Sequence, residues 1–252
     1  MHKALRALAP LAVAAVPLAF MAGPAMADSG SSYQATLNPL NHQTGSGMLT
    51  LTLNGSTATI DESWSGLAST FNGAPFPHVQ HIHIDGQGVC PSPSADKNND
   101  GVVNTTEGGP SYGAIGTTLS TKGDTSPAAG VNIKIAPAGS STSYHRVIQL
   151  DPKTVSSLKS DTAVIVVHGD DPATLSAKAQ KEKSDLVPSL PLAATSPALC
   201  GAVHAMPAGG VSTGTGSTAG MEDSSLLLLA GGLFAVGAGT ALFTVRRRTA
   251  TV

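Results

Sequence analysis

Two histidines on one short segment have the types and spacing of a metal chelate. Residues 78–83 read H-V-Q-H-I-H, so imidazoles recur among uncharged side chains. Successive side chains of a β-strand point to opposite faces, which places His81 and His83 on the same face. Imidazole nitrogens are ligands for copper and zinc. The pattern predicts a transition-metal site; the alternative is that each histidine is only packed or hydrogen-bonded within a strand.

A second candidate metal site follows in residues 96–107, which read D-K-N-N-D-G-V-V-N-T-T-E. They fit D-x-[DN]-x-[DN]-G-x5-E, the calcium loop whose hard oxygen ligands suit Ca²⁺. The predicted ligands are Asp96, Asn98, Asp100, the carbonyl of Val102, a water held by Asn104, and Glu107, with Gly101 at the sharp turn. Because C-P-S-P precedes the loop, we expect no flanking helices and a structural role for the calcium. The alternative is a solvated Asn/Asp turn.

The two ends of the chain carry export and anchoring signals. Basic residues, an apolar run and A-M-A identify residues 1–27 as a secretory signal peptide. Residues 226–245 are uncharged and long enough to cross a hydrocarbon core of ~30 Å. The arginines that follow predict a cytoplasmic tail, 246–252, and a body outside the cell. Residues 206–225 have the Gly/Ser/Thr composition of a flexible linker.

This layout resembles a Gram-positive cell-wall sorting signal and implies a single-pass protein at a bacterial-type cell surface. The sequence has no L-P-x-T-G pentapeptide, so a membrane anchor is the default and wall attachment by a sortase is the alternative. The formal net charge of −2 provides no basic surface, which argues against nucleic-acid binding.

The extracytoplasmic body, residues 28–205, has the composition of a β-rich domain. Gly, Thr, Ser and Pro are frequent while aromatic and charged residues are few, which favours short strands and turns. Strands are predicted over 33–41, 48–53, 57–60, 78–83, 131–135, 144–150, 161–168 and 199–204, with 112–119 a strand or a helical turn and a short helix over 173–181. Asn54-Gly55 predicts a hairpin turn. We expect an all-β, Greek-key antiparallel sandwich with one short helix.

Cys90 and Cys200 are the only cysteines of the chain. An exported protein with two cysteines usually pairs them. A bond that closes so long a loop contributes about 4 kcal/mol to the stability of the folded state. Two free thiols are the alternative.

The order of several motifs resembles that of copper/zinc superoxide dismutase, and the histidine strand with its preceding hairpin is similar to the chordin-type (CHRD) domain. The motifs are H-x-x-H-x-H at 78–83, G-x-x-x-C at 86–90, V-V-H at 166–168 and L-C-G at 199–201. The resemblance spans residues 33–204. It implies copper ligands at His81, His83 and His168, a supporting role for His78, and a disulfide between Cys90 and Cys200.

The chain departs from the dismutase pattern in two places. The loop after Cys90 has no histidine for the family's bridging ligand or zinc site, and it carries the calcium motif instead. Pro197 stands where the family's guiding arginine would lie. We therefore expect a calcium-clamped loop in place of a zinc-clamped one.

Together these features predict a metal-binding surface domain with structural calcium and with copper or zinc at three histidines. The alternatives are a copper-only enzyme similar to superoxide dismutase and an adhesive or partner-binding CHRD-type module. Lys178, Lys181 and Lys183 could supply positive charge that attracts an anion, but their simpler interpretation is the solvated face of the predicted helix. His145 or His204 could supply a fourth metal ligand, but the simpler interpretation is that both are surface histidines. No nucleophile elbow or triad is recognisable, which disfavours a hydrolase.

Overall fold

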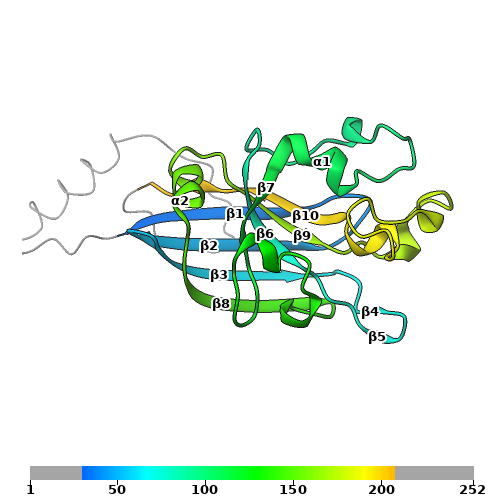
Figure 1. Cartoon of the computed structure of the whole chain (residues 1–252), viewed down its shortest axis with the longest axis horizontal. Helices are drawn as coiled ribbons and strands as arrows, with labels where there is room; N and C mark the ends of the chain where they lie inside the picture. Colours follow the sequence, from blue (N-terminus) through cyan, green and yellow to red (C-terminus); the bar gives the residue numbers. More distant parts are fainter. Residues whose placement is uncertain (1–29, 208–252) are drawn as a thin grey trace, which may run out of the picture. The chain divides into compact units, whose positions relative to one another are not determined.

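The computed structural model describes residues 30–207, which form an antiparallel β-sheet domain with two short α-helices (Figure 1). The strands are β1 (Ser31–Pro39), β2 (Ser46–Asn54), β3 (Thr57–Ser65), β4 (Thr70–Phe71), β5 (Ala74–Pro75), β6 (Gln80–Asp85), β7 (Gly113–Thr118), β8 (Ser141–Gln149), β9 (Val164–His168), β10 (Pro197–Ala202) and β11 (His204–Ala205). The helices are α1 (Thr105–Tyr112) and α2 (Pro152–Lys159), and 3₁₀ turns are η1 (Pro93–Ala95), η2 (Pro127–Ala129), η3 (Ile133–Ile135), η4 (Pro172–Thr174), η5 (Ala179–Lys181) and η6 (Leu192–Ala194). The predicted all-β, antiparallel class is confirmed.

The predicted signal peptide, the membrane span at 226–245, the tail and the linker beyond residue 207 lie outside the described residues. Within residues 30–207, none of the helices has the length and apolar character that a membrane crossing requires.

The main sheet has the strand order β7-β6-β9-β10-β1-β2-β3-β8, with β11 paired to β1. Strand β1 joins its two halves, because residues 31–37 pair with β2 whereas Asn38 and Pro39 pair with Cys200 and Leu199 of β10. Figure 1 shows β1, β2, β3 and β8 lying side by side. One strand therefore links the half that carries the hairpins to the half that carries the histidines.

The hairpin between β2 and β3 forms where the Asn-Gly pair predicts it. Asn54 pairs with Thr57, and Gly55 has a φ of +61°, in the left-handed region that a tight hairpin turn requires. Leu49, Leu51 and Leu53 alternate with polar residues and are buried, as a strand with one core face demands. This confirms the prediction for the hairpin.

The main core is shared by both halves of the sheet, which curls so that their apolar faces meet. Its members from the hairpin half include Leu37, Leu49, Leu51, Ile60 and Ile148, and those from the histidine half include Ile82, Ile165, Val167, Ala198 and Leu199. Trp64 also belongs to this core, with its Nε1 donating to Oε1 of Gln80 at 2.9 Å. The opposite face of β9, with Val164 and Val166, packs in a separate cluster beside Tyr112 and Cys200.

Cys90 and Cys200 form the predicted disulfide, with Cα atoms 5.8 Å apart. Cys200 lies on β10, and Cys90 lies in the loop between β6 and α1. The bond therefore fastens the segment before the acidic loop to the sheet. The predicted pairing is confirmed.

Three predictions about local structure are wrong. Residues 173–181 do not form an α-helix but the separate turns η4 and η5, so the predicted amphipathic helix with its lysine face does not exist. Residues 131–135 form no strand: Ile133–Ile135 are turn η3, and the side chain of Asn132 caps it by accepting a hydrogen bond from the Lys134 amide. The acidic loop does have a flanking helix: α1 begins inside the predicted calcium motif, where Asn104 and Glu107 form a capping box.

Candidate metal centre

Three histidines from two neighbouring strands meet on the face of the sheet opposite the main core. Strand β6 carries His81 and His83, and His168 ends β9; the two strands are antiparallel, with His81 opposite Val166 and His83 opposite Val164. Because side chains alternate along a strand, Ile82 points into the main core, and His81 and His83 point to the opposite face. The three imidazoles are only 2–3% exposed.

Each of the three rings has one nitrogen fixed by a backbone carbonyl. His81 donates through Nε2 to Gly130 at 2.9 Å, and His83 donates through Nδ1 to Gly113 at 2.9 Å. His168 donates through Nδ1 to Thr195 at 2.8 Å. A carbonyl only accepts, so these bonds fix the tautomer of each neutral imidazole and leave its other nitrogen with a free lone pair.

The free nitrogens are the ones that can bind a metal. Nδ1 of His81, Nε2 of His83 and Nε2 of His168 are buried and have no hydrogen-bond partner among the described residues. One ligand nitrogen from each ring lies within 4.8 Å of those of the other two. Metal-bound histidines commonly donate their second N–H to a carbonyl or carboxylate, which is the arrangement seen here.

Burial keeps these imidazoles neutral, as metal ligation requires. Desolvation, and then the adjacent His168 and His83, hold the pKa of His81 well below its usual value. Desolvation and His168 lower the pKa of His83 to about 3. Desolvation lowers the pKa of His168 to about 4, against the opposing effect of its bond to Thr195. All three nitrogens are therefore available to a metal at neutral pH.

A cavity of about 180 Å³ lies in front of the histidines. Besides the three rings, its wall includes Val79, Thr105, Tyr112, Gly113, Ile115, Gly130, Val131, Leu186 and Thr195. The rings of Tyr112 and His83 pack edge to face, with centroids 4.6 Å apart. Among residues 30–207, the wall includes no lysine or arginine that would attract an anion.

The other histidines singled out from the sequence lie outside this cluster. His78 is fully buried, with Nδ1 3.0 Å from the His168 carbonyl and Nε2 3.0 Å from the Ala68 carbonyl. It therefore contacts the backbone of His168 and offers no free nitrogen. His145 is exposed on β8, with Nδ1 2.6 Å from the Asp61 carboxylate, and His204 is exposed on β11. Neither of these two belongs to the three-histidine group.

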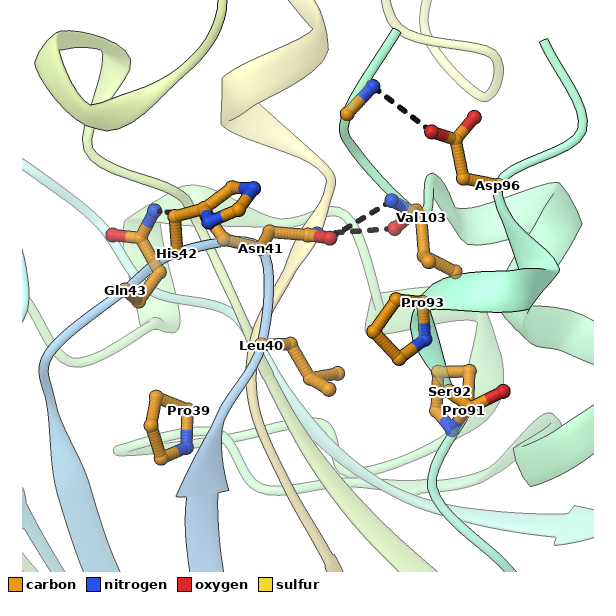
Figure 2. A pocket seen from close by; sticks show the side chains of 11 residues that line it. Pro39, Leu40, Asn41, His42, Gln43, Pro91, Ser92, Pro93, Asp96 and Val103 are labelled. Carbon is orange, nitrogen blue, oxygen red and sulfur yellow. Dashed lines mark hydrogen bonds between the residues drawn. The ribbon is translucent and has the colours of Figure 1, made fainter. Parts of the chain in front are cut away.

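The predicted calcium loop is held by hydrogen bonds among its own residues. Asp96 accepts from the Gly101 amide at 2.9 Å (Figure 2), and Asp100 accepts from the Val102 amide at 2.6 Å. Glu107 accepts from the amides of Lys97, Asn98 and Asn104. Among residues 30–207, only the three histidines form a group whose ligand atoms converge closely enough for a metal ion. The carboxylates of the loop are thus near one another in sequence, but their oxygens do not converge on a single metal position.

The loop is fastened to the rest of the domain at both edges. Asn41, in the turn between β1 and β2, accepts from the Val103 amide at 2.8 Å and donates to the Val103 carbonyl at 3.1 Å (Figure 2). On the other edge, Ser176 donates to the Asp100 carbonyl at 2.6 Å. A cavity of about 360 Å³ lies between the Asn41 turn and the loop. Hydrogen bonds therefore hold the loop against the rest of the domain on both sides.

The residues whose carbonyls accept hydrogen bonds from the histidine rings could not be identified from the sequence. The carbonyls of Gly113, Gly130 and Thr195 each come from the residue that ends a helix or 3₁₀ turn, and a backbone carbonyl is common to every residue type. A Cβ at Gly130 would lie 2.5 Å from Ile115 and 3.3 Å from Nε2 of His81, so a glycine there allows the close approach. This constraint appears only once the strands are assembled.

Glu182 is a further acidic residue beside the calcium motif that no sequence pattern identifies. Its Oε2 is 3.4 Å from Nδ2 of Asn98, and partial burial, then Asp100, raise its pKa. Lys178, instead of facing the histidine cavity, donates from Nζ to the Asn98 carbonyl at 2.6 Å. These contacts place the 176–182 segment against the acidic loop.

Comparison of the chain with models of known protein families and with curated proteins gave no match. A functional proposal therefore has to rest on the geometry of the site.

Proposed function

We propose that the protein is an exported surface domain that binds one copper or zinc ion through His81, His83 and His168. The observation that carries the proposal is the set of three free, buried ring nitrogens, each on a ring whose second nitrogen donates to a carbonyl. Three neutral imidazoles suit both metals by ligand type. The ion would bind to Nδ1 of His81 and to Nε2 of His83 and His168.

Several features support an extracytoplasmic location and a metal-binding role. The disulfide is typical of oxidising compartments, in agreement with the predicted signal peptide and membrane anchor. The order of the histidine and cysteine motifs is similar to that of the superoxide dismutase and CHRD families. We propose that calcium binds the 96–107 loop as a structural ion and draws the carboxylates of Asp96, Asp100 and Glu107 together.

A copper enzyme similar to superoxide dismutase is the second candidate function. The cavity in front of the histidines favours it, because three protein ligands leave a position open to an exogenous ligand. The wall without lysine or arginine disfavours it, because a negatively charged substrate gains no electrostatic attraction there. Metal binding without rapid anion turnover is the function that the geometry supports best.

The test is a titration of the purified, metal-free protein with Cu²⁺ and Zn²⁺, monitored by calorimetry. We expect one ion per chain, and we expect His83→Gln to weaken binding by at least tenfold because it removes one of three ligands. His204→Gln is the matched control, since this histidine is exposed and remote from the group. Equal affinities of the two variants would exclude the three-histidine site. A superoxide-loss assay of the copper-loaded protein separates the two candidate functions.

A further inference from the structure

One backbone carbonyl joins the histidine centre to the acidic loop. The carbonyl oxygen of Thr195 accepts from Nδ1 of His168 at 2.8 Å and from Oγ1 of Thr105 at 2.7 Å. Thr105 is the first residue of α1 and follows Asn104, the cap of that helix. Two donors that share one acceptor restrict the direction of that carbonyl, and its direction in turn orients the imidazole.

Helix α1 contacts a second histidine of the group through Tyr112. The Tyr112 hydroxyl donates to the Thr105 carbonyl at 3.0 Å, and the rings of Tyr112 and His83 pack edge to face. Tyr112 is only 1% exposed, so this packing is fixed. The hydroxyl of Thr105 and the ring of Tyr112 therefore lie on one short helix that begins within the predicted calcium motif.

The segment that carries Thr195 is also tied to the loop and to α1. Oγ1 of Thr195 and Oγ of Ser184 are 2.7 Å apart, and the carboxylate of the next residue, Asp185, accepts from the Thr106 amide at 2.6 Å. Ser176 bonds the Asp100 carbonyl further back along the same segment. The Thr195 carbonyl is thus held between two pieces of chain that are both anchored on the acidic loop.

We propose that Thr105 is a positioning residue for the three-histidine centre, acting through the Thr195 carbonyl on the tautomer and orientation of His168. In this relay, a displacement of the first turn of α1, such as cation binding in the 96–107 loop would produce, changes the affinity of the histidines for their metal. The consequence for metal affinity rests on the function proposed above, whereas the orientation of His168 does not.

The experiment compares Thr105→Val with Thr105→Ser and Thr106→Val. Valine matches threonine in shape but lacks the donor; serine keeps the hydroxyl; and Thr106 is the exposed neighbour, which uses only its backbone amide. We expect Thr105→Val to weaken Cu²⁺ or Zn²⁺ binding about tenfold, as loss of an outer-shell partner typically does. Thr105→Ser and Thr106→Val should bind as the parent protein does. If Thr105→Val and Thr106→Val have the same affinity, the relay is overturned.

A second readout works without any metal and separates failure of the relay from failure of the metal site. In nitrogen-15 NMR of the metal-free full chain, His168 should be in the Nδ1–H form, with a proton that exchanges slowly with solvent. Thr105→Val should speed that exchange several-fold or shift the tautomer, while Thr106→Val leaves both unchanged. Should the parent protein bind no metal while Thr105→Val alters His168, the function proposed above fails and the relay stands. An unchanged His168 signal in Thr105→Val overturns the relay whatever the metal result.

Discussion

The ring centroids of His81 and His168 are 5.2 Å apart, although one residue lies on β6 and the other ends β9. Antiparallel pairing of these strands, with His81 opposite Val166, brings the two rings together. Their free nitrogens, with that of His83, are buried and have no hydrogen-bond partner among residues 30–207. This arrangement has consequences for stability that can be measured separately from metal binding.

Acid should destabilise the metal-free protein through the buried histidines. Burial lowers the pKa of His83 to about 3 and that of His168 to about 4, from an ordinary value of 6.5. Protonation therefore favours the unfolded chain, so the stability is fully present above pH 6.5 and is lost as the pH falls toward these folded-state values. Urea unfolding at pH 7 and pH 5 should show a decrease that His83→Gln makes smaller. An identical decrease in parent and variant would contradict this assignment.

Alkaline pH should destabilise the protein through Glu62. This carboxyl lies on the core side of β3, paired with Tyr144 of β8, and both of its oxygens are buried without a hydrogen-bond partner among the described residues. Burial raises its pKa from 4.5 to about 8. The protonated form therefore favours folding: stability is full below about pH 4.5 and is lost as the pH rises through about 8.

Glu62→Gln tests this effect because glutamine is neutral and similar in shape. At pH 9 we expect the variant to be more stable than the parent protein by up to about 5 kcal/mol, since the pKa of Glu62 rises from 4.5 to about 8 and one pKa unit corresponds to about 1.4 kcal/mol. At pH 5, just above the ordinary pKa of 4.5, the difference should shrink to about 1 kcal/mol. Asp61→Asn, the exposed neighbour, is the control and should change neither value. A parent protein whose urea midpoint stays constant from pH 5 to pH 9 would refute a buried carboxyl at this position.

The fold was predictable from sequence where one local signal determines the outcome. Asn54-Gly55 predicts the hairpin because a tight turn with positive φ needs those residues, and the alternation of His81 with Ile82 and His83 predicts a shared face. The pairing of the two cysteines follows from their number in an exported chain. In each case tertiary packing agrees with the local preference.

Prediction failed where two segments have the same local sequence signal and tertiary contacts determine which of them forms a helix. Both Asp151-Pro152 and Asp171-Pro172 have the signature of a helix start, and both aspartates cap the following amides. Only the first leads to an α-helix, α2, whose Leu158 packs into the main core. After the second, Ser176 bonds to the Asp100 carbonyl of the acidic loop and the chain forms separate 3₁₀ turns. The sequence window contains no sign of this partner.

Calcium should stabilise the protein if the 96–107 loop binds it. Extracellular calcium loops have dissociation constants of about 10⁻⁴ to 10⁻³ M, so 10 mM Ca²⁺ should add about 1.4 to 2.7 kcal/mol to the free energy of unfolding. Thermal melting with Ca²⁺ or with EDTA should differ by several degrees. Asp96→Asn should remove the difference, whereas Asp61→Asn, outside the loop, should retain it. A parent protein that melts at the same temperature with and without Ca²⁺ would exclude the calcium site.

Reduction of the Cys90–Cys200 bond should lower stability substantially. The closed loop has a sequence separation of 110, and the chain-entropy model for a loop of that size gives about 4 to 5 kcal/mol. The double variant Cys90→Ser/Cys200→Ser should show this loss in urea unfolding and should weaken metal binding less than His83→Gln does. Loss of metal binding in the folded double variant, equal to that in His83→Gln, would show that the disulfide is required for the histidine geometry.

X-ray absorption of the copper- or zinc-loaded protein counts the imidazole ligands around the ion and therefore tests the three-histidine site itself. We expect three histidine nitrogens at about 2.0 Å in the parent protein and in His204→Gln, and two in His83→Gln. An ion with fewer than three imidazoles in the parent protein, or a spectrum that His83→Gln leaves unchanged, would contradict this expectation.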